Sequence, residues 1–214
     1  MRLAIHAPNL GLSLPEQPFG KDVANRGLYT ALATHGGFEQ INFCTAEQTP
    51  PASLQQQFGA APGAACLRVS PLTQTDAAAE AGTLLRGQPY LSELAWERGH
   101  RHGHQAYSLV GMIHTLAPPK VRELIGQVLL APVQPWDALI CTSPSVRNSL
   151  EQLLDRWQHH LQQRLLQHRG SDNRSMTELW FQQHPTQMHD NHKLLQFWHQ
   201  KTTTDLCNMV KCLS

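Results

Sequence analysis

Residues 107–129 read YSLVGMIHTLAPPKVRELIGQVL, and this stretch contains a complete strand–loop–helix unit. The apolar run over 107–113 is typical of a buried strand. His114 and Thr115 follow directly, and the prolines at 118–119 then open a segment with apolar residues on one helical face. A continuous apolar strand followed by a helix indicates a parallel sheet covered by helices.

The same alternation extends along the chain in both directions. Further strands are expected at 3–7, 41–45, 66–69 and 137–142, and further helices after Asp22, from 75 or 76 through Leu85, from Pro89 to Arg98, and after an N-cap at Ser143. Residues 46–64 show no clear pattern. The sequence therefore predicts an α/β fold with a Rossmann-like parallel sheet and helices on both faces. In such sheets ligands bind beyond the carboxyl ends of the strands.

Composition excludes several classes of protein. The chain has 214 residues, of which 41% are hydrophobic, and it carries 17 Lys and Arg against 16 Asp and Glu. This is enough for one core, but it gives no basic field for nucleic acid or an anionic membrane. The five cysteines form no CxxC pair, and no apolar run approaches the length of a membrane span. We expect a cytoplasmic protein without a nucleic-acid partner or a membrane span.

The composition changes sharply near residue 166. Residues 1–165 contain 20 Ala, 13 Gly and 13 Pro, whereas residues 166–214 contain no Ala, one Gly and one Pro. We therefore predict a domain over 1–165 and an atypical, short helical or irregular tail over 166–214. Three interpretations of the tail stay open: an accessory module, an unrelated or frame-disrupted (or disordered) end, and an ordinary helical extension.

The segment after the first strand is one candidate binding region. It contains Asn9, Gly20, Lys21, Asn25 and Gly27, and it runs into the start of a helix. A helix N-terminus suits phosphate or sugar hydroxyl groups, so these residues are candidate substrate-binding residues. Neither GxGxxG nor GxxxxGK[ST] is present, which leaves a dinucleotide or P-loop site unsupported. The alternative is a plain surface loop.

His114 is the candidate catalytic residue because it follows an apolar strand at the edge where ligands bind. An imidazole there is able to donate to an anion or a hydroxyl group, and it changes charge near neutral pH. Thr115 adds a hydroxyl group and is a candidate substrate-binding residue. The alternative for His114 is a purely structural histidine.

A metal site is not expected. His100, His102 and His104 form an HxHxH pattern, and imidazole is a common zinc ligand. However, Gly99 and Gly103 indicate a turn, and no nearby cysteine completes a ligand set. GxSxG and HExxH are also absent.

Four stretches together resemble a known family. MRLAIHAPN (1–9) with GKDVANRGLYTALATHGGFEQINFCT (20–45), then YSLVGMIHTL (107–116) and WDALICTSPSVRNSLEQLL (136–154), resemble the N-terminal domain of retaining glycosyltransferases of the two-domain GT-B fold, group 1, family 4. The resemblance covers roughly residues 1–165 and has no single invariant signature.

The resemblance implies transfer of a sugar from a nucleotide-sugar donor to a glycan or other hydroxyl acceptor, with retention and without a metal or other cofactor. In the family the N-terminal domain mainly holds the acceptor, and the C-terminal domain holds the nucleotide. His114 matches a histidine that reaches the donor sugar. Gly20 through Gly27 match the family's glycine loop loosely, because Gly20-Lys21 and Arg26-Gly27 stand where paired glycines are frequent.

No nucleotide-domain pattern follows residue 165. The expectation is therefore an incomplete glycosyltransferase that is inactive as this chain alone. One alternative is a non-catalytic α/β module that binds a glycan, an anion or a protein. Another is a non-functional fragment that self-associates through an exposed domain face.

Overall fold

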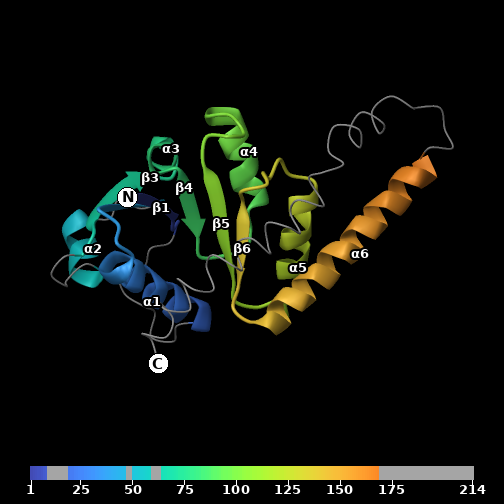
Figure 1. The fold of residues 1–214 in the computed structure, drawn as a ribbon, viewed down its shortest axis with the longest axis horizontal. Coiled ribbons are helices and arrows are strands. Elements are labelled where there is room, and N and C mark those ends of the chain that lie inside the picture. Colours follow the sequence, from blue (N-terminus) through green and yellow to red (C-terminus); the bar gives the residue numbers. More distant parts are fainter. Residues whose placement is uncertain (9–18, 47–49, 59–63, 169–214) are drawn as a thin grey trace.

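The computed structural model describes residues 1–8, 19–46, 50–58 and 64–168, and strands and helices alternate along them (Figure 1). In chain order the elements are β1 (Arg2–His6), α1 (Gly20–His35), β2 (Gln40–Thr45), α2 (Pro51–Phe58), β3 (Cys66–Pro71), α3 (Asp76–Ala81), β4 (Thr83–Arg86), α4 (Ser92–Arg101), β5 (Ser108–Ile113), α5 (Pro119–Gly126), the short 3-10 helix η1 (Gln127–Leu129), β6 (Ala138–Cys141) and α6 (Pro144–His168).

All six strands are parallel and lie in the order β3-β2-β1-β4-β5-β6. This confirms the predicted Rossmann-like α/β fold. The chain starts at β1, adds strands on one side, and then crosses to add β4, β5 and β6 on the other. The direction of winding therefore reverses between β1 and β4, and ligands of open α/β sheets bind at such a switch point.

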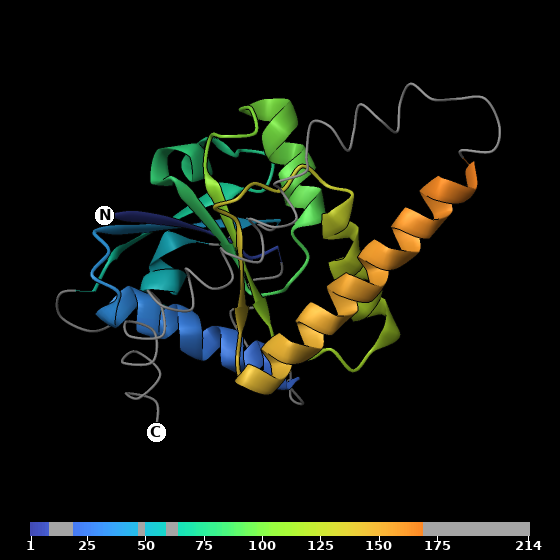
Figure 2. The same ribbon diagram turned by 45° about the vertical axis from the view of Figure 1, so that its right-hand side comes forward.

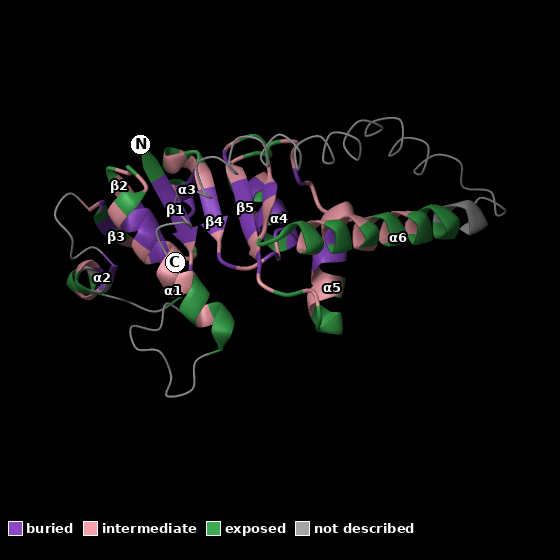
Figure 3. Cartoon of the chain, turned by 60° about the horizontal axis from the view of Figure 1, so that its bottom comes forward, coloured by how far each residue is buried: buried purple, intermediate pink, exposed green. Residues whose placement is uncertain are grey.

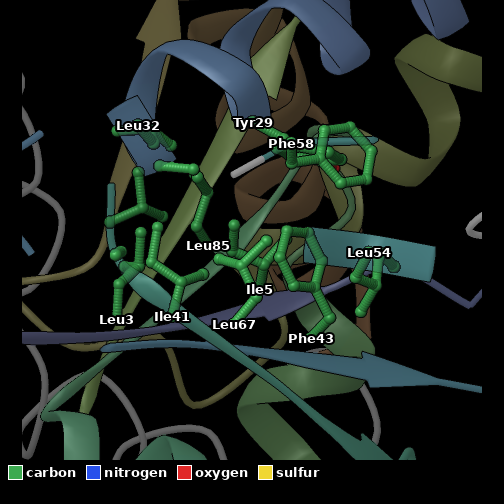
Figure 4. Packing of buried hydrophobic residues seen from close by; sticks show 14 residues of the cluster. Leu3, Ile5, Tyr29, Leu32, Ile41, Phe43, Leu54, Phe58, Leu67 and Leu85 are labelled. Atoms are coloured by element: carbon green, nitrogen blue, oxygen red, sulfur yellow. The ribbon is translucent and has the colours of Figure 1, made fainter. Parts of the chain in front are cut away.

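Helices α1 and α2 cover the face of the sheet that the odd-numbered residues of β1 and β2 present. Their buried side chains pack on Ile5, Ile41 and Phe43 (Figure 4). Tyr29 of α1 and Phe58 of α2 join Phe43 in one aromatic group, with ring centroids 5.6 to 6.3 Å apart. The sequence forms this layer because alternate strand residues point to opposite faces and both faces are apolar.

Helices α3, α4 and α5 cover the opposite face. Ala4, Leu84 and Leu109 pack there against α3 and α4, and Ile113 packs against α5 and the first half of α6. Right-handed connections on either side of a switch point place helices on opposite faces in this way. Strands β1, β2 and β5 are largely buried between these layers (Figure 3), whereas the edge strands β3 and β6 are mostly half-buried or exposed.

The central strand β4 is missing from the sequence prediction, in which the preceding helix continues through Leu85. That expectation is wrong, because Gly82 adopts a left-handed conformation (φ 72°) that ends α3 after six residues. The next four residues then pair with β1 and β5. A glycine after a short helix is a common terminator, and the strand that follows is too short to show a pattern of its own.

Other boundaries differ from the expected ones by a few residues. Helix α1 begins at Gly20 rather than after Asp22, so Asp22 lies in its first turn, where a carboxylate is favoured by the helix dipole. Helix α4 runs through Arg101, past the expected end at Arg98. The N-cap at Ser143 is confirmed, since the backbone N–H of Val146 donates to its hydroxyl oxygen at 3.2 Å.

Helix α6 is 25 residues long and extends beyond the sheet (Figures 1 and 2). Its first half is anchored by Leu150, which is fully buried, and by the Trp157 ring, which lies against Gly126 at the end of α5. The helix continues past the composition change near residue 166, and the rest of the predicted tail lies outside the described residues. Among the described residues, no helix is both long and apolar enough to cross a lipid bilayer.

Candidate functional site at the strand switch point

Three residues from separate parts of the chain meet at the carboxyl ends of the central strands. Asn25 lies on α1, Gly87 directly follows β4, and His114 directly follows β5. The Nε2 atom of His114 is 2.9 Å from Oδ1 of Asn25 and 3.0 Å from the carbonyl oxygen of Gly87. Nδ2 of Asn25 donates to the same carbonyl at 3.0 Å. The predicted catalytic histidine and one predicted binding residue therefore belong to one hydrogen-bonded group.

Gly87 is the centre of this group, and the neighbouring side chains leave no room for a Cβ atom at this position. A Cβ atom at this position would lie 2.5 Å from the hydroxyl oxygen of Tyr29 and 2.6 Å from Cγ of Asn25. Burial raises the pKa of Tyr29 to about 12, although the backbone N–H of Gly87 donates to the phenol oxygen and acts in the opposite direction. Tyr29 thus stays a neutral phenol that connects the site to the aromatic core.

Near this group, on the face of the sheet opposite α1, His6 of β1 lies beside Arg86 of the neighbouring strand β4. The Nδ1 atom of His6 is buried and has no partner among the described residues. Arg86 donates to the carbonyl oxygen of Tyr90 at 2.7 Å and pairs with Glu93 at 3.4 Å. Burial, together with the positive charge of Arg86, lowers the pKa of His6 to about 4.

The depressed pKa of His6 predicts a loss of stability in mild acid. Well above pH 6.5 the ring is neutral in both the folded and the unfolded chain, so its titration does not affect stability there. As the pH falls from 6.5 to about 4, the unfolded chain takes up a proton that the folded chain excludes. The free energy of unfolding should therefore fall over this range by up to about 3 kcal/mol. Urea denaturation at several pH values measures it.

The control for this prediction is the difference between two glutamine variants. His6→Gln should flatten the pH dependence relative to wild type, whereas His100→Gln, on an exposed position of α4, should leave it unchanged. Parallel curves for wild type and His6→Gln would contradict the prediction.

The other predicted binding residues that the structure describes lie outside this hydrogen-bonded group. Thr115 is exposed, and its hydroxyl oxygen accepts the backbone N–H of Ala117 at 3.1 Å. Lys21 is exposed at the start of α1, with its ammonium group 5.8 Å from the Phe19 ring centroid. Gly20 and Gly27 are helical residues of α1, with open space where a Cβ would stand. Asn9 lies outside the described residues.

The sequence pattern does not reveal Gly87 or Tyr29 as members of the site. At Gly87 it indicates only the end of a helix, and Tyr29 falls in a helical segment without an assigned role. The HxHxH residues do not form a cluster: His102 has Oγ1 of Thr75 2.6 Å from its Nε2, and no group of three or more metal-ligating side chains occurs in the described residues.

Comparisons with models of known protein families, with curated proteins and with solved structures find no match for this chain. The fold and the site geometry define a Rossmann-like α/β domain in which Asn25, Gly87 and His114 form one hydrogen-bonded group beside the switch point.

Proposed function

We propose that this domain is the acceptor-side half of a retaining GT-B glycosyltransferase, with His114 facing the reacting sugar. The observation that carries the proposal is the position of His114. The histidine directly follows β5, and it is bonded to groups from α1 and from the end of β4, which borders the switch point. Ligands of this sheet type bind at that edge.

The sequence resemblance supports the same assignment. The four similar stretches cover β1, α1, β2, β5, β6 and the first part of α6, which lie in or against one sheet. Sugar recognition needs hydrogen-bonding groups with fixed directions rather than a strong charge. The imidazole of His114 and the amide of Asn25 are such groups.

In this proposal the second, nucleotide-binding half is a separate domain or polypeptide. The histidine holds one hydroxyl group of the sugar, and the nucleotide half supplies the groups that stabilise the leaving phosphate. Because transition-state stabilisation needs positioned groups on all sides, the 214-residue chain by itself should bind sugars weakly and transfer none.

The test is a binding titration followed by NMR. The purified chain is titrated with UDP-glucose, GDP-mannose and a panel of methyl glycosides, and backbone amide shifts are recorded. We expect shifts at His114, Asn25 and Gly87, with weak binding of at least one compound. His114→Ala should weaken that binding about five- to tenfold, the effect of one lost hydrogen bond.

His100→Ala is the matched control, because it removes an exposed histidine from α4. It should leave binding unchanged. No shift with any sugar, or equal effects of both variants, would contradict the proposal. Sugar binding without transfer, after a nucleotide-binding half has been supplied, would instead favour the non-catalytic glycan-binding module.

A further inference from the structure

We propose that Asn25 is a positioning residue that, with the carbonyl group of Gly87, fixes the proton of His114 on Nε2 and leaves Nδ1 as a hydrogen-bond acceptor. This inference deepens the proposed function and rests on it for the identity of the ligand. The assignment of the proton itself rests only on the hydrogen-bond geometry.

The carbonyl oxygen of Gly87 sets the direction of the whole network. A carbonyl group only accepts, so the Asn25 atom 3.0 Å from it must be the amide nitrogen. The amide oxygen of Asn25 then faces His114. Nε2 of His114 therefore lies between two oxygen acceptors, at 2.9 and 3.0 Å, and must carry a hydrogen to bond either of them.

For a neutral ring, every other arrangement of the His114 proton and the Asn25 amide places two acceptors against each other. A proton on Nδ1 alone would turn the lone pair of Nε2 toward the Gly87 oxygen. Rotating the Asn25 amide to donate to Nε2 would bring its own oxygen to 3.0 Å from the same carbonyl. Part-buried acceptors that face each other lose hydrogen bonds which water no longer replaces, so both alternatives are disfavoured.

The consequence concerns what the site recognises. Within the described part of the chain, Nδ1 of His114 has no hydrogen-bond partner. A neutral ring fixed in this tautomer offers a lone pair at Nδ1, and a lone pair accepts from a hydroxyl group. It does not match phosphate oxygens, which are acceptors as well. The geometry therefore selects a polyol hydroxyl over an anion at this atom.

The tautomer is measured directly by long-range ¹⁵N–¹H NMR of the histidine rings, at a pH where the His114 ring is neutral. The His114 signals are assigned by their absence in His114→Gln, among the 13 histidines of the chain. We expect one ring nitrogen, Nε2, in the protonated range and Nδ1 in the unprotonated range. A proton on Nδ1, or averaged shifts for the two nitrogens, would overturn the proposal.

The role of Asn25 is tested by Asn25→Asp at pH 7. A carboxylate beside Nε2 favours a second proton on the ring, so both nitrogens should move toward the protonated range. Ala24→Asp is the control, because it adds the same charge at an exposed neighbouring position of α1. Equal spectra for the two variants would overturn the role of Asn25.

Failure of this inference differs from failure of the proposed function. The expected tautomer together with no shift from any methyl glycoside would support the role of Asn25 and remove the glycosyltransferase assignment. Glycoside binding that is lost in His114→Ala, together with a proton on Nδ1, would keep the assignment and overturn the inference. Titration with inorganic phosphate completes the test: tighter binding of phosphate than of the glycosides at neutral pH would also overturn it.

Discussion

Replacing Asp137 by leucine should lower the free energy of unfolding by about 3–5 kcal/mol, a large part of the roughly 5–15 kcal/mol that stabilises a typical domain. Asp137 lies just before β6 and is 3% exposed, and its partner Arg98 on α4 is fully buried. Their two nitrogen–oxygen pairs are 2.7 and 2.8 Å apart. Removing one charge leaves the other buried without compensation.

The Asp137 carboxylate also accepts two backbone N–H groups, from Leu109 and from Gln134, both at 2.7 Å. Arg98 donates in addition to the carbonyl oxygens of Tyr107 and Pro132. The pair therefore joins α4 to the starts of β5 and β6, at the end of the sheet opposite the candidate site. Asp137→Leu leaves two backbone N–H groups without an acceptor, whereas Arg98→Met leaves two carbonyl oxygens without this donor. Because a buried N–H group without a partner is tolerated less well than such a carbonyl, Asp137→Leu should destabilise the protein more than Arg98→Met.

Guanidinium denaturation of the purified variants checks this ranking. Glu123→Gln is the matched control, since it removes one partner of an exposed pair, Lys120–Glu123 on α5, and should cost less than about 1 kcal/mol. If Asp137→Leu changed the free energy of unfolding no more than Glu123→Gln does, the buried pair would not have the structural role assigned to it.

The fold class could be predicted because the signals for its strands and helix ends each lie within one short segment of the sequence. Five of the six strands, all but β4, are four to six residues long and rich in apolar residues. The capping pair Ser143–Pro144 and the Pro118–Pro119 opening likewise act on their own neighbours. Such signals are read directly from one stretch of chain.

The strand order and the site contacts depend on distant residues, so no local pattern reveals them. Asn25 and His114 are separated by 89 positions, and Arg98 and Asp137 by 39. Strand β4 is an example, because its sequence TLLR is compatible with a helix as well as with a strand. Its pairing with β1 and β5 determines that this segment forms a strand. Because the sequence analysis does not predict β4, it does not place Gly87 at the carboxyl end of a strand and does not identify it as a residue of the site.

Substituting alanine for Gly87 should disrupt the candidate site and destabilise the fold by about 1–3 kcal/mol, the usual cost of forcing extra atoms into a packed region. The added Cβ atom would be 2.5 Å from the Tyr29 hydroxyl oxygen. The Tyr29 ring is unable to move far from this atom, because it is only 6% exposed and packs edge-on against Phe43 and Phe58. Asn25 must move as well, which breaks its bond to His114.

The same substitution at Gly27 provides a control with the opposite sign. Gly27 lies inside α1, and an alanine Cβ there would have no other atom within 4 Å beyond its own helix backbone and chain neighbours. Gly27→Ala should therefore stabilise the protein by about 0.5–1 kcal/mol. Thermal unfolding measures both variants, and the ring ¹⁵N shifts of His114 report the site. Tyr29→Phe added to Gly87→Ala removes the closest atom and should restore part of the stability. If Gly87→Ala were as stable as Gly27→Ala and kept the His114 shifts, Gly87 would not be the centre on which Asn25 and His114 depend.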